Sequence, residues 1–164
     1  MQPLEALFRH NVWANLKLLE ACCDLEDSVL DAEVPGTYGS IRATLIHIVR
    51  AEASYYGRVT GEKPDRSGWG EVPSIEQLTV AARHTGRGLV REAPRVQPGD
   101  SVQVEWDGEM VDVDTSLILL QAINHATEHR THVATILTQN GVTPPEMDGW
   151  SYVGALRADG DANV

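Results

Sequence analysis

The chain has 164 residues, 42% of them hydrophobic and 23% charged, which is the composition of one globular domain large enough to bury its own core. Its formal net charge of −11 makes nucleic acid and anionic membranes poor partners, because binding to either depends largely on basic side chains. The first residues lack a secretory signal pattern and no apolar run is long enough to span a bilayer, so we expect a cytoplasmic protein.

Apolar residues recur at helical spacing in four segments, each with signals of a helix start or end. Pro3 suits a first helical turn, and Ser40 can cap the second helix. Ser74 and Gln77 form a capping-box pattern before the third, and Gly141 can end the fourth. The predicted helices span residues 3–23, 41–58 and 75–93, with a fourth from a cap among residues 114–116 to residue 140.

The connections between these helices carry turn residues. Residues 24–40 are expected to form a loop with a short helical turn, and residues 60–73 a long loop rich in glycine and proline. Two alternating segments flank Asp107-Gly108, which predicts a small β-hairpin over residues 101–113. A further short helix is expected from Asp148.

Four long helices with a small hairpin before the last one predict an all-α fold, a helix bundle with crossover connections. The two long inter-helix segments argue against a simple up-down-up-down arrangement. Residues 1–157 are expected to form this domain, and residues 158–164 a disordered C-terminal tail.

The segment NHATEHRTHV, residues 124–133, holds three of the six histidines of the chain. His125, His129 and His132 stand at positions i, i+4 and i+7, so they share one face of a helix. Such a stripe is compatible with core residues, solvated side chains, a pH switch or metal ligands. Two imidazoles four residues apart can converge on one ion, although this spacing alone is a weak signal.

His47 lies in the middle of the second predicted helix, within LIHIVRAEA, among apolar neighbours. It could be a single core histidine hydrogen-bonded to a carbonyl group. A buried neutral imidazole needs partners, however, and ligands carried by helices converge in bundle cores. His47, His125 and His129 are therefore compatible with one three-imidazole site.

Four stretches of the chain carry a resemblance to a known family. In order they are NVWANLKLLEA (11–21), YGSIRATLIHIVRAE (38–52), LLQAINHATEHRTHV (119–133) and MDGWSYV (147–153). Over nearly its full length the chain resembles the DinB/YfiT-like family of metal-dependent proteins. This resemblance implies an up-down-down-up four-helix bundle that often forms a homodimer.

The resemblance also implies a metal site made of His47, His125 and His129. His132 stands where many members carry glutamine, and we expect it to lie outside the ligand set, as a neighbour of the ligands. Three neutral imidazoles suit one divalent transition metal, zinc or nickel first and iron or cobalt as alternatives, and they leave coordination positions open.

In function, the chain is similar to the thiol-dependent S-transferases of this superfamily. In that chemistry a divalent ion activates a low-molecular-weight thiol, which attacks an electrophile, so a small thiol and an electrophile are the expected partners. The alternatives are a metal-dependent hydrolase, a non-catalytic stress-related metal-binding module, and a helical dimer whose histidines only respond to pH.

Three charged residues near the histidines are candidates for catalytic work. Glu128 precedes His129, and Glu52 follows His47 by five residues, so either could carry protons. For each of them the favoured interpretation is a solvated helix charge. Arg130 is the third candidate, and its structural alternative is to bridge a buried carboxylate or a helix end.

Overall fold

The computed structural model describes residues 1–62, 69 and 72–159. The four long predicted helices are confirmed, with ends that differ by no more than two residues from the predicted ones. The elements are α1 (Pro3–Cys22), α2 (Asp27–Leu30), α3 (Ile41–Thr60), α4 (Ile75–Glu92), the 3-10 helix η1 (Ala93–Arg95), β1 (Ser101–Trp106), β2 (Glu109–Asp114), α5 (Thr115–Gln139) and α6 (Gly149–Asp159).

The helix ends form where the sequence provides caps. The hydroxyl of Ser40 accepts a hydrogen bond from a backbone N–H in the first turn of α3. Ser74 and Gln77 form the predicted capping box of α4, with hydrogen bonds of 3.2 Å and 2.9 Å. Gly61 after α3 and Gly141 after α5 have φ of 77° and 74°, a left-handed conformation that glycine adopts without strain.

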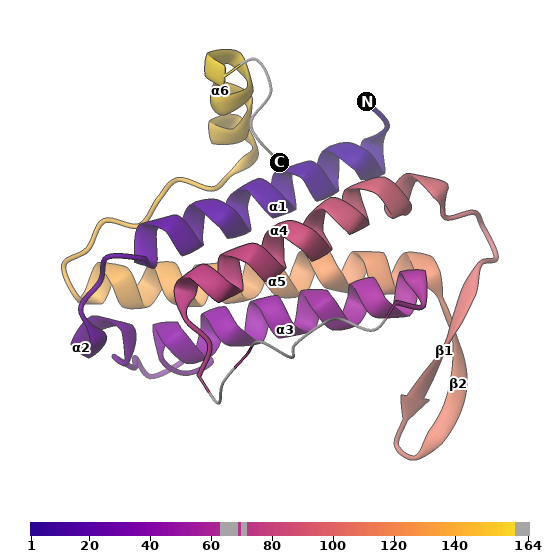
Figure 1. Ribbon diagram of the computed structural model, residues 1–164, viewed down its shortest axis with the longest axis horizontal. Helices are drawn as coiled ribbons and strands as arrows, with labels where there is room; N and C mark the ends of the chain where they lie inside the picture. Colours follow the sequence, from indigo (N-terminus) through magenta and orange to yellow (C-terminus); the bar gives the residue numbers. More distant parts are fainter. Residues whose placement is uncertain (63–68, 70–71, 160–164) are drawn as a thin grey trace.

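The chain is mostly helical, and its four long helices pack side by side. α1 packs against α4 and α5, and α3 packs against the same two helices. Figure 1 shows that α1 and α5 run towards the end of the molecule where α2 lies, whereas α3 and α4 start there and run away from it. The buried apolar side chains fill the space between these helices.

The predicted hairpin is present, and its second strand leads directly into α5. Asp107 and Gly108 have φ of 51° and 85°, as a two-residue turn between antiparallel strands requires. β2 ends at Asp114, whose carboxylate accepts the backbone N–H of Ser116 at 2.8 Å and so caps α5. The hairpin projects from the end of the molecule where α4 ends and α5 begins (Figure 1).

The segments at the ends of the long helices also contain the expected short helices. α2 lies within the first connection, and α6 begins after Asp148, which accepts two backbone N–H groups of its first turn. α6 runs to residue 159 and so enters the range predicted as a tail, of which residues 160–164 lie outside the described residues. Much of the predicted loop 60–73 lies outside them as well. Among the described residues, no helix is long and apolar enough to cross a membrane.

Two glycines in α4 allow close contact with the neighbouring helices. A Cβ atom on Gly86 would lie 2.4 Å from a methyl group of Val12 in α1. A Cβ atom on Gly88 would lie 2.2 Å from the ring of Tyr56 in α3. Both distances are far below van der Waals contact, so these positions have no room for a side chain.

Replacement of Gly88 by alanine is therefore expected to destabilise the protein by about 1–3 kcal/mol, the usual cost of forcing extra atoms into a packed core. Among the described residues, a Cβ atom on Gly154 in α6 would meet no neighbouring side chain or helix within 4 Å, so Gly154→Ala is the matched control. Urea denaturation followed by circular dichroism measures both. Equal stability of the two variants would contradict the close packing of α4 on Tyr56.

Candidate metal centre

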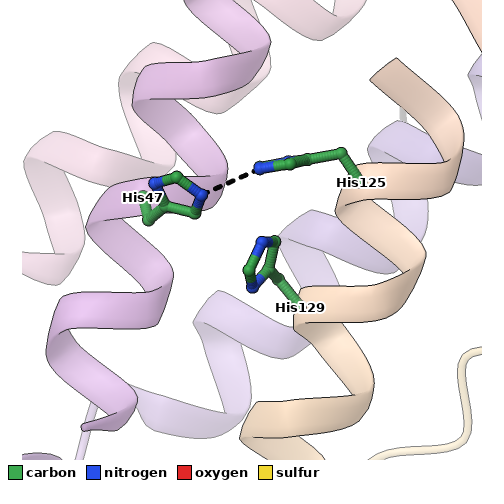
Figure 2. A group of neighbouring side chains, drawn as sticks. All are labelled: His47, His125 and His129. Atoms are coloured by element: carbon green, nitrogen blue, oxygen red, sulfur yellow. Dashed lines mark hydrogen bonds between the residues drawn. The ribbon is translucent and has the colours of Figure 1, made fainter. Parts of the chain in front are cut away.

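His47 of α3 and His125 and His129 of α5 come together between these two helices (Figure 2). The Nε2 atoms of His47 and His125 are 2.8 Å apart. One ring nitrogen from each of the three residues lies within 4.8 Å of the other two. Residues 78 positions apart in the chain therefore form a single cluster of imidazoles.

The local structure explains why the three side chains converge. His125 and His129 are one helical turn apart on α5, so both project towards the neighbouring α3. His47 lies near the middle of α3, which packs against α5. His129 is buried, with 7% of its surface exposed, and the other two are half-buried. The cluster is thus shielded on one side and open on the other.

The environment of the cluster favours neutral imidazoles. Burial lowers the pKa of all three histidines, because it penalises the charged form. The effect is largest for His125, where burial and the neighbouring imidazoles of His129 and His47 lower the pKa to about 4. Neutral imidazole is the form that binds a metal ion, so the site is ready to bind near neutral pH.

The donor atoms fit a divalent transition metal. With metal–nitrogen distances of about 2.0–2.1 Å, two ligands lie roughly 3.3 Å apart at a tetrahedral angle and roughly 2.9 Å apart at a right angle. The 2.8 Å between the Nε2 atoms of His47 and His125 lies at the short end of this range. The Nδ1 atoms of His129 and of the neighbouring His132 are buried and have no hydrogen-bond partner among the described residues. A buried polar atom without a partner is costly unless something binds it. Three neutral imidazoles at this spacing suit the ions that prefer nitrogen ligands.

Two tyrosines border the cluster, and neither was predicted there from the sequence. The ring of Tyr38 stacks on His47, with centroids 4.1 Å apart, and meets His129 edge-on at 4.9 Å. Tyr38 is 51% exposed, so its ring forms part of the open side. Tyr55 lies edge-on to His125 at 5.9 Å. Tyr38 precedes α3 in a loop, and helical periodicity cannot indicate where a loop residue will lie.

Two more of the predicted residues lie around the cluster. The ring of His132 is 5.3 Å from that of His129, outside the group of three. Glu128 is exposed, and its negative charge acts on His125 and His129 by raising their pKa, against the larger effect of burial. Glu128 is therefore a charged group at the surface near the three histidines.

The structure places Glu52 in a buried hydrogen-bond network. Its carboxylate, 4% exposed as a residue, accepts hydrogen bonds from Asn11 at 3.1 Å and from Asn15 at 2.9 Å, both on α1. The hydroxyl of Thr85 on α4 donates a third bond at 2.9 Å. Three donors therefore surround this carboxylate, which is directed towards α1 and α4.

Arg130 occupies the other side of the same network. Its Nη1 donates to the side-chain oxygens of Asn11, at 2.8 Å, and Asn15, at 2.6 Å. Burial raises the pKa of Glu52 to about 7 and lowers that of Arg130 to about 10, while each charge partly offsets this for the other. The suggested bridge from Arg130 to a buried carboxylate thus exists, but it passes through two asparagines.

We call Asn11, Asn15, Glu52 and Arg130 the buried amide network. The two asparagines were not predicted from the sequence as part of a site. A signal was present, because they are four residues apart on α1, on the same buried side as Phe8 and Val12. Two polar residues one turn apart on a buried face indicate a shared polar partner in the core.

Comparison with known proteins gives one family. The model of the DinB family matches residues 1–156 of the chain. No curated protein matches it. The matched range contains the three histidines, the hairpin and most of α6. Since the match covers nearly the whole sequence, the chain belongs to the DinB family.

Proposed function

We propose that His47, His125 and His129 bind one divalent transition metal, zinc or nickel before iron or cobalt. The support is the close approach of their ring nitrogens and the burial that lowers the pKa of all three. His132 is proposed to stay outside the ligand set, because its ring contacts only His129 of the three.

We further propose that the protein is an enzyme of the thiol-dependent S-transferase type. The observation that carries this proposal is the number of ligands. Among the described residues the cluster offers three protein ligands, whereas a structural zinc site is closed by four. A bound ion would thus keep a position for a small molecule, and its Lewis acidity would lower the pKa of a thiol held there.

The reaction would transfer a group from an electrophile to a low-molecular-weight thiol. The sulfur forms a bond to the electrophilic carbon, the leaving group departs with its bonding electrons, and the thiol proton passes to solvent. The stacked ring of Tyr38 would hold the imidazole of His47 in place and form one wall for the substrates. Exposed Glu128 is the candidate group that accepts this proton and releases it to solvent, whereas buried Glu52 and Arg130 would not contact the substrates.

The proposed assembly is a cytoplasmic homodimer of up-down-down-up bundles. The opposite directions of α1 and α5 relative to α3 and α4 support this bundle topology (Figure 1). Leu4, Leu7 and Leu120 are 36%, 49% and 54% exposed and line one cavity of about 610 Å³. Exposed apolar patches of this kind commonly mark contacts between proteins, which supports a dimer.

The transferase proposal predicts a direct bond between thiol and metal. In the cobalt-substituted protein, addition of cysteine or glutathione is expected to produce a sulfur-to-cobalt charge-transfer band in the near ultraviolet. A thioether of the same size lacks the acidic proton and is the control, expected to give no band. A cobalt protein that shows no such band with any cellular thiol would argue for the hydrolase or the non-catalytic alternative.

A further inference from the structure

The buried amide network joins the two helices that carry the histidines. Glu52 lies on α3, five residues after His47, and Arg130 directly follows His129 on α5. No direct ion pair joins Glu52 to Arg130 within the part of the chain that the structure describes. Both are held instead by Asn11 and Asn15 of α1, through four hydrogen bonds of 2.6–3.1 Å.

The chemistry of these groups fixes the orientation of each amide. A guanidinium only donates hydrogen bonds, and an ionised carboxylate only accepts them. The NH₂ groups of both asparagines therefore point to Glu52, and their oxygens point to Arg130. The result is two parallel bridges from α3 to α5, one through Asn11 and one through Asn15 of α1, and all four residues of the network are buried.

These bridges constrain the rotation of the two helices about their axes. At 3.6 residues per turn, Glu52 lies about 140° around α3 from His47, and Arg130 about 100° around α5 from His129. Holding Glu52 and Arg130 against α1 thus turns the histidines towards the space between α3 and α5. Side-chain tips lie about 5–6 Å from a helix axis, so a rotation of only about 10° would displace them by roughly 1 Å. Metal sites tolerate little more than about half of that displacement.

We propose that the buried amide network is a positioning element of the metal centre, which sets the rotation of α3 and α5 so that the three imidazoles stand at ligand distance before the ion binds. The proposal rests on metal binding by the three histidines, as proposed above. It assigns to Asn11 and Asn15 a role in metal affinity, although they lie on α1, which carries none of the three histidines.

The test compares Asn11→Ala and Asn15→Ala with Thr85→Val. Each asparagine variant removes one bridge and keeps the other, whereas Thr85→Val removes a hydrogen bond to the same carboxylate without touching the link to α5. Cobalt affinity is measured by competition with a chromophoric chelator, at a temperature where circular dichroism shows each variant to be folded. We expect the asparagine variants to lose about 10-fold or more in affinity, as is typical for residues that orient metal ligands, and to show an altered visible cobalt spectrum.

Thr85→Val is expected to lower the melting temperature but to keep the wild-type affinity and spectrum, because global stability does not change binding by a population that is already folded. Wild-type affinity and spectrum in both asparagine variants would overturn the positioning role while leaving the metal site itself intact. A wild-type protein that binds no cobalt would instead overturn the metal site. If an asparagine variant does not fold, Arg130→Lys is measured in its place, because lysine keeps the charge but lacks the Nη1 group that donates to both amides and the Nη2 group that donates to Thr127.

Discussion

Alanine in place of His47 or His125 is expected to remove the metal from a protein that stays folded. Either change deletes one of the three proposed ligands, and the loss of metal affinity should exceed the roughly 100-fold upper range seen when residues behind metal ligands are replaced. Both side chains are half-buried, so their loss leaves the apolar core in place. Two variants on different helices test whether α3 and α5 contribute to one site.

Elemental analysis of protein purified without a histidine tag gives the metal content. Wild type is expected to hold about one equivalent of a divalent transition metal, and His47→Ala and His125→Ala almost none. His84→Ala is the control, because this histidine lies on α4 against Tyr56 and outside the cluster. Metal retained at wild-type level in either ligand variant would refute a site shared between the two helices.

The same variants should lose the stabilisation that metal provides. An ion present at about 1,000 times its dissociation constant stabilises the folded state by about 4 kcal/mol. For a domain of this size that corresponds to a rise in melting temperature of roughly 8–16 °C. Differential scanning fluorimetry with and without added metal is expected to show this rise in wild type and in His84→Ala only.

Arg130→Met is expected to destabilise the metal-free protein by about 3–5 kcal/mol, the usual cost of removing one partner from a buried charged pair. The side-chain oxygens of Asn11 and Asn15 would lose their donor in a place that water does not reach. Glu52 would also lose the positive charge that lowers its pKa. Urea denaturation in the presence of a chelator measures the free energy of unfolding.

The destabilisation by Arg130→Met should grow as the pH rises. The pKa of Glu52 is about 7 in the folded protein, above its ordinary value of 4.5. A raised carboxyl pKa contributes stability that is present below the unfolded value and lost as the pH rises towards the folded value. Without the charge of Arg130, the pKa of Glu52 in the folded protein rises further. The variant therefore continues to lose stability up to a higher pH than wild type.

We therefore expect a larger difference in unfolding free energy at about pH 8.5 than at about pH 6, because Glu52 is ionised in wild type only above its raised pKa. Introducing Glu52→Gln into both proteins should remove this extra difference, since glutamine does not titrate. A difference that stays constant with pH would show that the carboxylate and the guanidinium do not interact through the amides.

Elements governed by near neighbours in the chain could be predicted from the sequence. Helix ends followed from Ser40, Ser74 and Gly141, and the hairpin turn from Asp107-Gly108, because a cap or a turn is decided within a few residues. The pairing of His125 with His129 on one face of α5 is equally local, since the helical repeat alone brings them together.

Tertiary structure decided what lies across the gaps between helices. Three contacts depend on how α1, α3 and α5 are rotated and packed. The Nε2 atoms of His47 and His125 lie 2.8 Å apart, and the ring of Tyr38 stacks on His47. Asn11 and Asn15 join Glu52 to Arg130. Helical periodicity identifies the buried face of each helix but not which residue of another helix it meets. Contacts between residues 78 or 119 positions apart arise only when the whole core closes, because packing and the satisfaction of buried polar groups select one rotation of each helix.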